Sequence, residues 1–321
     1  LGQPIQDPAL PASRGADDQP CATTLTMRDR RGDESCFEDG HGPPTVTRRA
    51  SPRETRRWRR VSPYGRPMTG LHDERVVWVT GAASGIGRAT VNEVVAEGGQ
   101  VVASDLPTAD FGWVDSDAVA VITGDVTDPD HNEASVALAL ERFGRIDGAV
   151  LNAGIAEQVD LFEGSLDHFD RTWEVNVRAI VLGIRSAARH MRPGAALTTT
   201  ASTSGLRGDP GMWAYNTSKA AVLNLVRSTS IDLAARGIRI NAVCPGPTDT
   251  GMTAGLQAIP EVYEDLRRRV PMQRWGSASE LAAAHSFLLS TKASFITGAH
   301  LVVDGGISAN TGQFMPPAFS L

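Results

Sequence analysis

An apolar segment followed at once by a glycine-rich turn and a helical segment is the feature that most restricts how this chain can fold. Residues 76–80, Val-Val-Trp-Val-Thr, have the apolar and β-branched character of a buried strand. Residues 81–87, Gly-Ala-Ala-Ser-Gly-Ile-Gly, form the turn, and residues 88–97 have helical spacing. Glycine has no Cβ atom, so it allows a tight turn and a close approach of the backbone to a ligand.

A strand, a glycine turn and a helix in this order bring the pyrophosphate of a dinucleotide onto free N–H groups at the helix N-terminus. The sequence therefore predicts a dinucleotide-binding turn. The residues predicted to contact the cofactor there are Gly81, Ser84, Gly85, Ile86 and Gly87.

The acid at the end of the next predicted strand, residues 100–105, indicates which dinucleotide binds. Asp105 lies 18 positions after Gly87, close to the spacing of ~20 residues typical of an acid that binds the adenosine ribose. Its carboxylate can accept hydrogen bonds from a 2′-hydroxyl and would repel a 2′-phosphate. Leu106 follows it, and Ser84 in the turn is not basic either. These three positions favour NAD over NADP.

Strand and helix patterns alternate along the rest of the chain. Strands are predicted at residues 76–80, 100–105, 119–124, 147–151, 196–201, 238–243 and 298–303. Helices are predicted at residues 86–98, 130–143, 166–191, 212–236 and 278–290. This alternation predicts a single Rossmann-like, doubly wound α/β domain, with a seven-stranded parallel sheet and helices on both faces.

The first 67 residues differ in composition from the rest. They contain nine of the 19 prolines and no lysine, and they lack apolar periodicity. Such a segment buries too little apolar surface to offset its ordering entropy. We therefore predict a disordered or poorly structured Pro/Arg-rich arm at residues 1–67 and a catalytic, NAD-binding domain at residues 68–321. The arginines of the arm either bind an acidic surface or nucleic acid, or are simply solvated; the second interpretation is favoured.

Charge, cysteine content and hydropathy restrict the partners and the compartment. The net charge is −6, so nucleic acid is not an expected partner of the whole chain. The three cysteines, Cys21, Cys36 and Cys244, show neither a metal-ligand spacing nor a disulfide framework. No apolar run approaches the ~20 residues that cross a membrane. The sequence predicts no metal site, no membrane association and a reducing, cytoplasmic location.

Tyr215 and Lys219 form a pair that can exchange a proton with a substrate. They are four residues apart in the predicted helix 212–236, so they face the same way. An ammonium group stabilises a phenolate and would lower the tyrosine pKa from its usual value of ~10. The spacing alone favours an exposed helical pair, and the glycine turn upstream is what favours catalysis.

Taken together, these motifs resemble those of the short-chain dehydrogenase/reductase family over residues 72–313. Thr80–Gly87 matches its Thr-Gly-x-x-x-Gly-x-Gly motif, and Asn152-Ala153-Gly154 matches the segment that ends its fourth strand. The resemblance implies further cofactor contacts at Asp125, Val126, Asn152, Ala153, Gly154, Pro245, Gly246, Thr248 and Thr250, besides Tyr215 and Lys219.

The resemblance also implies roles for four side chains. Tyr215 would exchange the proton, Lys219 would lower its pKa and hold the nicotinamide ribose, and Ser202 would polarise the substrate oxygen. Asn176 would hold a water molecule that links Lys219 to solvent. Family members usually form homotetramers through helices equivalent to residues 166–191 and 212–236, so a homotetramer is expected.

Two loops are expected to select the substrate, residues 204–213 before Tyr215 and residues 251–275, which form a lid in family members. The side chains expected to contact the substrate are Ser204, Leu206, Met212, Trp213 and Met252. These loops resemble those of bacterial meso-2,3-butanediol dehydrogenases (acetoin reductases). The prediction is thus an NAD-dependent oxidoreductase that interconverts a small secondary alcohol, such as the vicinal diol 2,3-butanediol, and its ketone; a cyclic or sterol-like alcohol remains open.

Two other functions fit the same fold. An NADPH-type 3-oxoacyl-carrier-protein reductase would carry basic residues near Ser84 or Leu106, and the sequence has none there. A non-catalytic cofactor-sensing protein would have a broken Tyr/Lys pair, whereas Tyr215 and Lys219 are both present.

Overall fold

The computed structural model describes residues 60–61, 67–68 and 70–317. Strands β1 (Arg60–Val61) and β2 (Pro67–Met68) pair antiparallel. The remainder of the predicted N-terminal arm lies outside the described residues.

A seven-stranded, fully parallel sheet forms the centre of the domain, as predicted. Its strands are β3 (Val76–Thr80), β4 (Gln100–Asp105), β5 (Val119–Thr123), β6 (Gly148–Leu151), β7 (Ala196–Thr200), β8 (Arg239–Pro245) and β11 (His300–Val303). Their order across the sheet is β11-β8-β7-β6-β3-β4-β5. The predicted boundaries differ from these by at most two residues, because strand ends are set by local hydrogen bonding.

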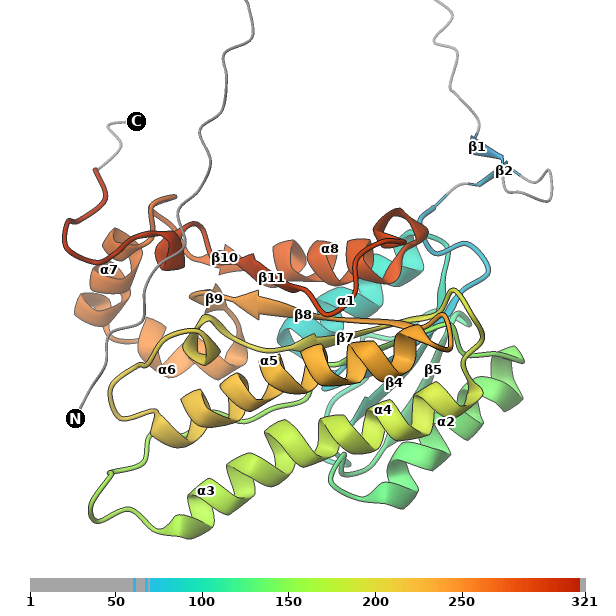
Figure 1. Ribbon diagram of the computed structural model, residues 1–321, viewed down its shortest axis with the longest axis horizontal. Helices are drawn as coiled ribbons and strands as arrows, with labels where there is room; N and C mark the ends of the chain where they lie inside the picture. Colours follow the sequence, from blue (N-terminus) through green and yellow to red (C-terminus); the bar gives the residue numbers. More distant parts are fainter. Residues whose placement is uncertain (1–59, 62–66, 69, 318–321) are drawn as a thin grey trace, which may run out of the picture. The chain divides into compact units, whose positions relative to one another are not determined.

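Helices cover both faces of this sheet. They are α1 (Gly85–Ala96), α2 (Pro129–Phe143), α3 (Leu166–Trp173), α4 (Ala179–His190), α5 (Trp213–Ala234) and α8 (Ala278–Leu289). Figure 1 shows α1 and α8 on one side of the sheet, and α2, α4 and α5 on the other. The fold is therefore the expected doubly wound α/β arrangement.

Strand β3 shows why both faces are covered. All five of its residues are buried. Trp78 belongs to the larger core cluster beneath α2, α4 and α5, while Val77 and Val79 belong to the cluster beneath α1. Side chains alternate between faces along a strand, so a continuous apolar run has to be buried on both sides.

The strand order reverses beside β3, and this reversal positions the functional site. From β3 the chain continues outward to β4 and β5, and then returns to the other side of β3 to form β6 and β7. The loops after β3 and β6 consequently diverge and leave a crevice at the carboxyl ends of the strands, where open α/β sheets bind ligands. The glycine turn lies in this crevice, between β3 and α1.

The predicted helix at residues 166–191 is interrupted in the middle. Five residues, Glu174–Arg178, form a π-helical segment between α3 and α4. A π-turn adds one residue without changing the apolar pattern over so short a stretch, so sequence periodicity could not reveal it.

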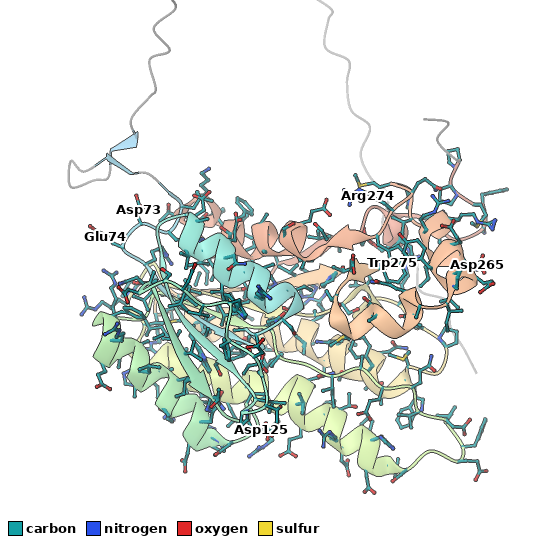
Figure 2. All side chains as sticks on the ribbon, turned by 180° about the vertical axis from the view of Figure 1, so that it is seen from behind. Asp73, Glu74, Asp125, Asp265, Arg274 and Trp275 are labelled. Atoms are coloured by element: carbon teal, nitrogen blue, oxygen red, sulfur yellow. The ribbon has the colours of Figure 1, made fainter. Side chains whose placement is uncertain are left out.

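The segment after β8 contains helices that the sequence did not predict. It contains strand β9 (Thr248–Asp249), the short helical turn η3 (Gly251–Thr253), α6 (Ala254–Gln257), α7 (Pro260–Arg269) and strand β10 (Gly276–Ser277). Helix α7 has no fully buried residue. Its apolar stripe consists of Val262, Tyr263 and Leu266, which are only half-buried, and such a short stripe among charged residues did not indicate a helix. Trp275 stacks on Tyr263 of this helix with 5.1 Å between ring centroids, and Arg274 forms an ion pair with Glu280. Figure 2 labels Arg274 and Trp275.

Two fully buried histidines make the stability of the domain depend on pH. Burial, with a smaller contribution from Arg75, lowers the pKa of His72 to about 4. Burial lowers the pKa of His285 to about 3. Both side chains are therefore neutral in the folded protein near neutral pH.

We predict that the free energy of unfolding is larger at pH 7.5 than at pH 5.5. In the unfolded chain these histidines take up protons as the pH falls below ~6.5. In the folded chain they remain neutral until a much lower pH. Their contribution to the free energy of unfolding is therefore fully present above pH ~6.5, and it is lost as the pH falls toward their folded-state pKa values. Denaturant unfolding at the two pH values measures the difference. His72→Gln should reduce it, and equal unfolding free energies for the unmodified chain would contradict the prediction.

Candidate active site

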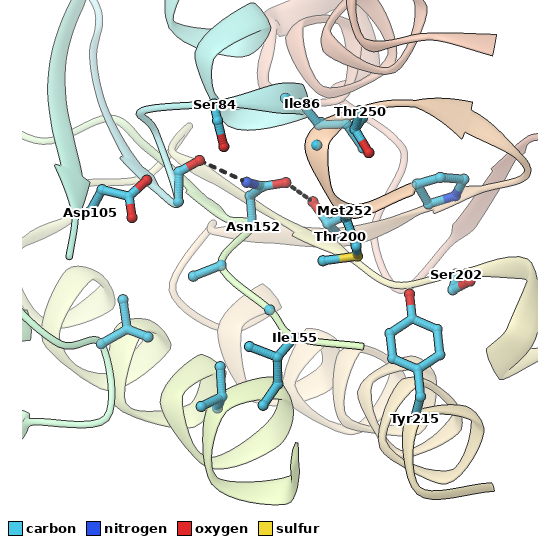
Figure 3. Close-up of a pocket in the computed structure, with 18 of the residues that line it drawn as sticks. Ser84, Ile86, Asp105, Asn152, Ile155, Thr200, Ser202, Tyr215, Thr250 and Met252 are labelled. Carbon is cyan, nitrogen blue, oxygen red and sulfur yellow. Dashed lines mark hydrogen bonds between the residues drawn. The ribbon is translucent and has the colours of Figure 1, made fainter. Parts of the chain in front are cut away.

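A pocket of about 330 Å³ follows the carboxyl edge of the sheet. In Figure 3 Asp105 lies at one end of the pocket, Tyr215 and Ser202 lie at the other, and Asn152 lies between them. The predicted site residues that line the pocket are Gly81, Ser84, Gly85, Ile86, Asp105, Leu106, Asp125, Val126, Asn152, Ala153, Gly154, Ser202, Tyr215, Lys219, Pro245, Gly246, Thr248, Thr250 and Met252. The fold thus brings residues from all parts of the domain to one cavity.

The other predicted site residues do not line this pocket: Gly87, Asn176, Ser204, Leu206, Met212 and Trp213. Gly87 lies beneath the turn, where an added Cβ atom would come within 1.9 Å of the Gly81 carbonyl oxygen. Trp213 stacks on Phe169 with 5.5 Å between centroids, and its Nε1 donates to the Val159 carbonyl at 2.9 Å. Trp213 therefore fixes a loop rather than forming a wall of the cavity.

Several lining residues were not named from the sequence: Gly124, Ile155, Arg171, Val175, Thr200, Ala201, Gly251 and Thr253. Most of them adjoin a residue that was named. Arg171 is different, because it lies on α3, away from any motif. The signal for it was helical spacing, since Arg171 and Val175 are four residues apart and so lie on one side of the helical segment.

The glycine turn and the start of α1 fit the pyrophosphate of a dinucleotide. Gly81 and Gly85 have φ angles of +63° and +51°, a region that side chains rarely adopt. The Ser84 side chain makes no capping hydrogen bond, and the first turn of α1 contains no acidic residue. The first N–H groups of α1 therefore remain available for an anion, and the helix dipole favours one.

Asp105 is held rigidly at the other side of the turn. Its two carboxylate oxygens accept hydrogen bonds from the backbone N–H groups of Ala83 at 2.9 Å and Leu106 at 2.8 Å. Each oxygen keeps acceptor capacity for a hydroxyl group of a ligand. The turn that would hold a pyrophosphate and the acid that would hold a ribose are thus fixed to each other.

Tyr215, Lys219 and Ser202 meet at the opposite end of the pocket. Tyr215 and Lys219 lie one turn apart on α5, and the Lys219 ammonium lies 5.6 Å from the Tyr215 ring centroid. Lys219 is buried, and its Nζ donates to the Thr200 carbonyl oxygen at 2.8 Å. Ser202, just after β7, hydrogen-bonds the Tyr215 side chain and accepts from the backbone N–H of Ser204 at 3.1 Å.

Burial shifts the pKa values of the tyrosine and the lysine in opposite directions. It lowers the pKa of Lys219 to about 8. Burial raises the pKa of Tyr215 above its ordinary value, and the hydrogen bond to Ser202 only partly offsets this. The sequence prediction of a lowered tyrosine pKa is therefore wrong for the protein without a ligand, because removing a phenolate from water costs more than its neighbours return.

Asn176 lies in the π-helical segment directly behind these groups. Its side chain is fully buried; Oδ1 accepts from the Ile155 N–H at 2.8 Å, and Nδ2 donates to the Ile155 carbonyl at 2.9 Å and to Ser218 Oγ at 3.0 Å. Oδ1 and the Lys219 ammonium both lie close to Gly154. The π-turn thus directs Asn176 toward the loop after β6, on the side where Lys219 lies.

Two negative findings concern the described part of the chain. None of its helices is both long and apolar enough to span a bilayer. Nor do three or more His, Cys, Asp or Glu side chains gather there in a way that could hold a metal ion.

Known proteins resemble this chain over nearly the whole domain. A family model described as enoyl-(acyl carrier protein) reductase matches residues 81–308. Cis-4-hydroxycyclohexanecarboxylate dehydrogenase of Sinomonas cyclohexanicum is 39% identical over 74% of this chain and 97% of its own. Meso-2,3-butanediol dehydrogenase of Serratia marcescens is 36% identical over 75% of this chain and 97% of its own.

A solved structure supports the same relationship. The short-chain dehydrogenase/reductase of Brucella melitensis, described as a glucose/ribitol dehydrogenase, superposes with a TM-score of 0.70 at 32% identity, over 75% of this chain and 99% of its own. With the fold, the pocket and these similarities in agreement, the chain belongs to the short-chain dehydrogenase/reductase family.

Proposed function

We propose that this protein, an oxidoreductase of its family, uses NAD to interconvert a small secondary alcohol and its ketone. A vicinal diol such as 2,3-butanediol is the leading substrate. The observation that carries the proposal is a single pocket with the glycine turn and Asp105 at one end and Tyr215, Lys219 and Ser202 at the other. Its length and polarity suit a dinucleotide with a compact alcohol beside the nicotinamide.

The chain's own groups would handle the proton and the substrate oxygen. A bound nicotinamide would accept or supply the hydride. The Ser202 hydroxyl would donate a hydrogen bond to the substrate oxygen, and Tyr215 would exchange the proton with it. Lys219 would supply positive charge beside the phenolate and, by family resemblance, hold the nicotinamide ribose. Asn176 would orient a water molecule next to Lys219.

The raised pKa of Tyr215 has a consequence for direction. Near neutral pH the phenol is protonated, so it is ready to donate its proton to a ketone oxygen. In the reverse direction the tyrosine has to lose its proton. The Lys219 ammonium, 5.6 Å from the ring centroid, would stabilise the resulting phenolate while the lysine keeps its own proton, up to a pH of about 8. We therefore propose that ketone reduction is favoured at neutral pH and alcohol oxidation at higher pH.

The choice of NAD rests on the adenosine end of the pocket. Asp105 lies there with Leu106, which is half exposed, and Ser84. None of the three can pair with a 2′-phosphate, and the carboxylate would repel it. The same residues argue against the NADPH-type 3-oxoacyl-carrier-protein reductase. The intact Tyr215–Lys219 pair argues against a non-catalytic cofactor sensor.

The substrate end offers both apolar surface and one cation. Ile155, Val175 and Met252 supply apolar walls that fit a small alcohol. Similarity to the Serratia meso-2,3-butanediol dehydrogenase supports a diol. Arg171 also lines the pocket, and its side chain forms no ion pair among the described residues. This favours a second candidate, a hydroxy acid, in line with the similarity to a hydroxycyclohexanecarboxylate dehydrogenase.

Assembly and location remain part of the proposal. We propose a cytoplasmic homotetramer that forms through α3–α4 and α5. Apolar side chains near these helices are exposed in the single chain, among them Phe162, Leu166 and Ile231. Covering them in an oligomer would remove this apolar surface from water. Light scattering coupled to size-exclusion chromatography measures the oligomeric state.

The Tyr215→Phe variant should lose at least ~100-fold in kcat for 2,3-butanediol oxidation and acetoin reduction. The phenyl ring keeps the shape of the pocket but has no proton to exchange, so NADH binding, followed by fluorescence, should stay unchanged. Tyr263→Phe makes the same chemical change outside the pocket and serves as the control. Full turnover by Tyr215→Phe would refute the proposed role.

The Asp105→Ala variant should shift the cofactor preference toward NADP by at least ~10-fold in kcat/KM, since it removes both the ribose acceptor and the repulsive charge. Steady-state assays with the two cofactors measure the ratio. Asp110→Ala, a nearby exposed carboxylate outside the pocket, should leave the ratio unchanged. A wild-type chain that already prefers NADPH would revive the carrier-protein reductase.

The Arg171→Gln variant should distinguish the two substrate classes. If the substrate is a hydroxy acid, kcat/KM for 4-hydroxycyclohexanecarboxylate should fall by ~10- to 100-fold while cyclohexanol and 2,3-butanediol are unaffected. Arg185→Gln, an exposed arginine on α4 outside the pocket, is the matched control. If kcat/KM falls equally for acidic and neutral alcohols, Arg171 does not bind the substrate carboxylate, and the diol remains the candidate.

A further inference from the structure

A continuous chain of hydrogen bonds connects a buried histidine on α8 to the glycine turn. His285 is fully buried behind the sheet. Its Nδ1 lies 2.8 Å from Thr198 Oγ1, and its Nε2 lies 3.2 Å from Thr200 Oγ1. Thr200 in turn contacts Asn152, and Asn152 contacts the glycine turn. None of these links was identified from the sequence, because they join four separate segments.

The donor-to-acceptor direction of this series of hydrogen bonds is fixed at its Asn152 end. Asn152 Nδ2 lies 3.1 Å from the Thr80 carbonyl oxygen and 3.3 Å from the Gly81 carbonyl oxygen, and carbonyls only accept. The amide is therefore oriented with Oδ1 toward Thr200, whose hydroxyl donates to it at 2.9 Å. Figure 3 shows one hydrogen bond from Asn152 to Thr200 and another on the opposite side of the Asn152 amide.

This direction determines the tautomer of His285. A hydroxyl has one proton, and Thr200 gives its proton to Asn152. The contact at 3.2 Å then requires His285 to be the donor through Nε2–H. Because burial keeps the imidazole neutral, Nδ1 carries no proton and accepts from the Thr198 hydroxyl. Every hydrogen bond from Thr198 to the glycine turn therefore points the same way.

Thr200 also holds the catalytic end of the pocket. Its backbone carbonyl accepts the hydrogen bond of the Lys219 ammonium at 2.8 Å. The Thr200 carbonyl thus contacts Lys219, while the Thr200 hydroxyl contacts Asn152, which is bonded to the glycine turn. The imidazole of His285 fixes the position of this hydroxyl. Helix α8 in addition packs along α1, which begins at the same glycine turn.

We propose that His285 is a positioning residue, which through Thr200 and Asn152 aligns the glycine turn with Lys219. His285 does not itself line the pocket; it reaches the site through Thr200, which does. The proposal rests on the proposed function for its NADH-binding and activity measurements, but not for its spectroscopic measurement. Replacing a histidine with only a structural role would lower stability without changing NADH binding. The effects of replacing His285 are therefore compared with those of replacing such a histidine.

His72 supplies that comparison. His72 is also a fully buried, neutral histidine. Its Nε2 lies 2.9 Å from the Oγ of Ser286, the residue that follows His285 on α8. Its hydrogen bond leads away from the pocket, and it is not among the lining residues. Removing either imidazole should lower the melting temperature, while only one of them is linked to the site.

The first experiment measures NADH binding and turnover in His285→Leu, His285→Gln and His72→Leu. His285→Leu should raise the NADH Kd and lower kcat/KM, each by ~5- to 10-fold, because the hydrogen bond that positions Thr200 is lost. His285→Gln keeps an N–H near Nε2 and should recover much of both. His72→Leu should change them less than twofold at a comparable melting temperature.

A second variant covers the case in which His285→Leu does not fold. Thr200→Val keeps the volume and the carbonyl partner of Lys219 but removes the hydroxyl link, so it should reproduce the rise in NADH Kd. Where His285→Leu folds, combining it with Thr200→Val should add little to the effect of Thr200→Val on the NADH Kd, since both changes break the same series of hydrogen bonds. Full additivity would overturn the proposal.

Nitrogen NMR of ¹⁵N-histidine-labelled protein tests the tautomer without any ligand. His285 should show a protonated Nε2 and an unprotonated Nδ1; the opposite pattern would overturn the assigned direction. The proposal also fails if His285→Leu and His72→Leu lose stability alike and neither alters NADH binding. If the unmodified chain neither binds NADH nor turns over any alcohol, the proposed function fails instead, and the NMR result still decides the hydrogen-bond chain.

Discussion

The pocket depends on how the ends of β3 and β6 are joined where the strand order reverses. The regular pairing of these strands ends at Val79 and Val150. Beyond it the Thr80 hydroxyl accepts from the backbone N–H groups of Asn152 at 2.9 Å and Ala153 at 3.0 Å. A side chain thus continues the ladder after the backbones diverge. The crevice can open there without leaving buried N–H groups unpaired, which would be costly.

The other end of the pocket contains a buried cation. Lys219 is 3% exposed, and its ammonium has one hydrogen-bond acceptor, the Thr200 carbonyl, among the described residues. Burial of an ammonium with so few partners is unfavourable, and it appears as the pKa lowered to about 8. A side chain of this kind is expected where function rather than stability dictates the residue.

The sheet and the glycine turn could be predicted from the sequence because each depends on local patterns, whereas many of the other pocket residues were predicted through the family resemblance. The apolar run at residues 76–80 can only be buried on both faces, and the spacing of Asp105 from Gly87 follows from one strand–helix–strand unit. The contributions of Asn176 and Arg171 depend instead on the exact helical phase of residues 166–178. The π-turn at Glu174–Arg178 sets that phase, and no pattern of five residues distinguishes it from an α-turn.

Trp213 shows the same limit on the substrate side. Its apolar ring next to Tyr215 suggested a wall of the pocket, but its indole N–H donates to Val159, and the Val159 N–H donates to the Gly211 carbonyl at 3.0 Å. Arg207 further ties this loop to the carbonyls of Ser308 and Asn310. The loop before Tyr215 is therefore held from two sides and does not line the cavity. The cavity is lined instead by Ile155 from the loop after β6, by Arg171 and Val175 from the α3 region, and by Met252 from the start of the segment after β9. Under the proposed function, these four residues would select the substrate.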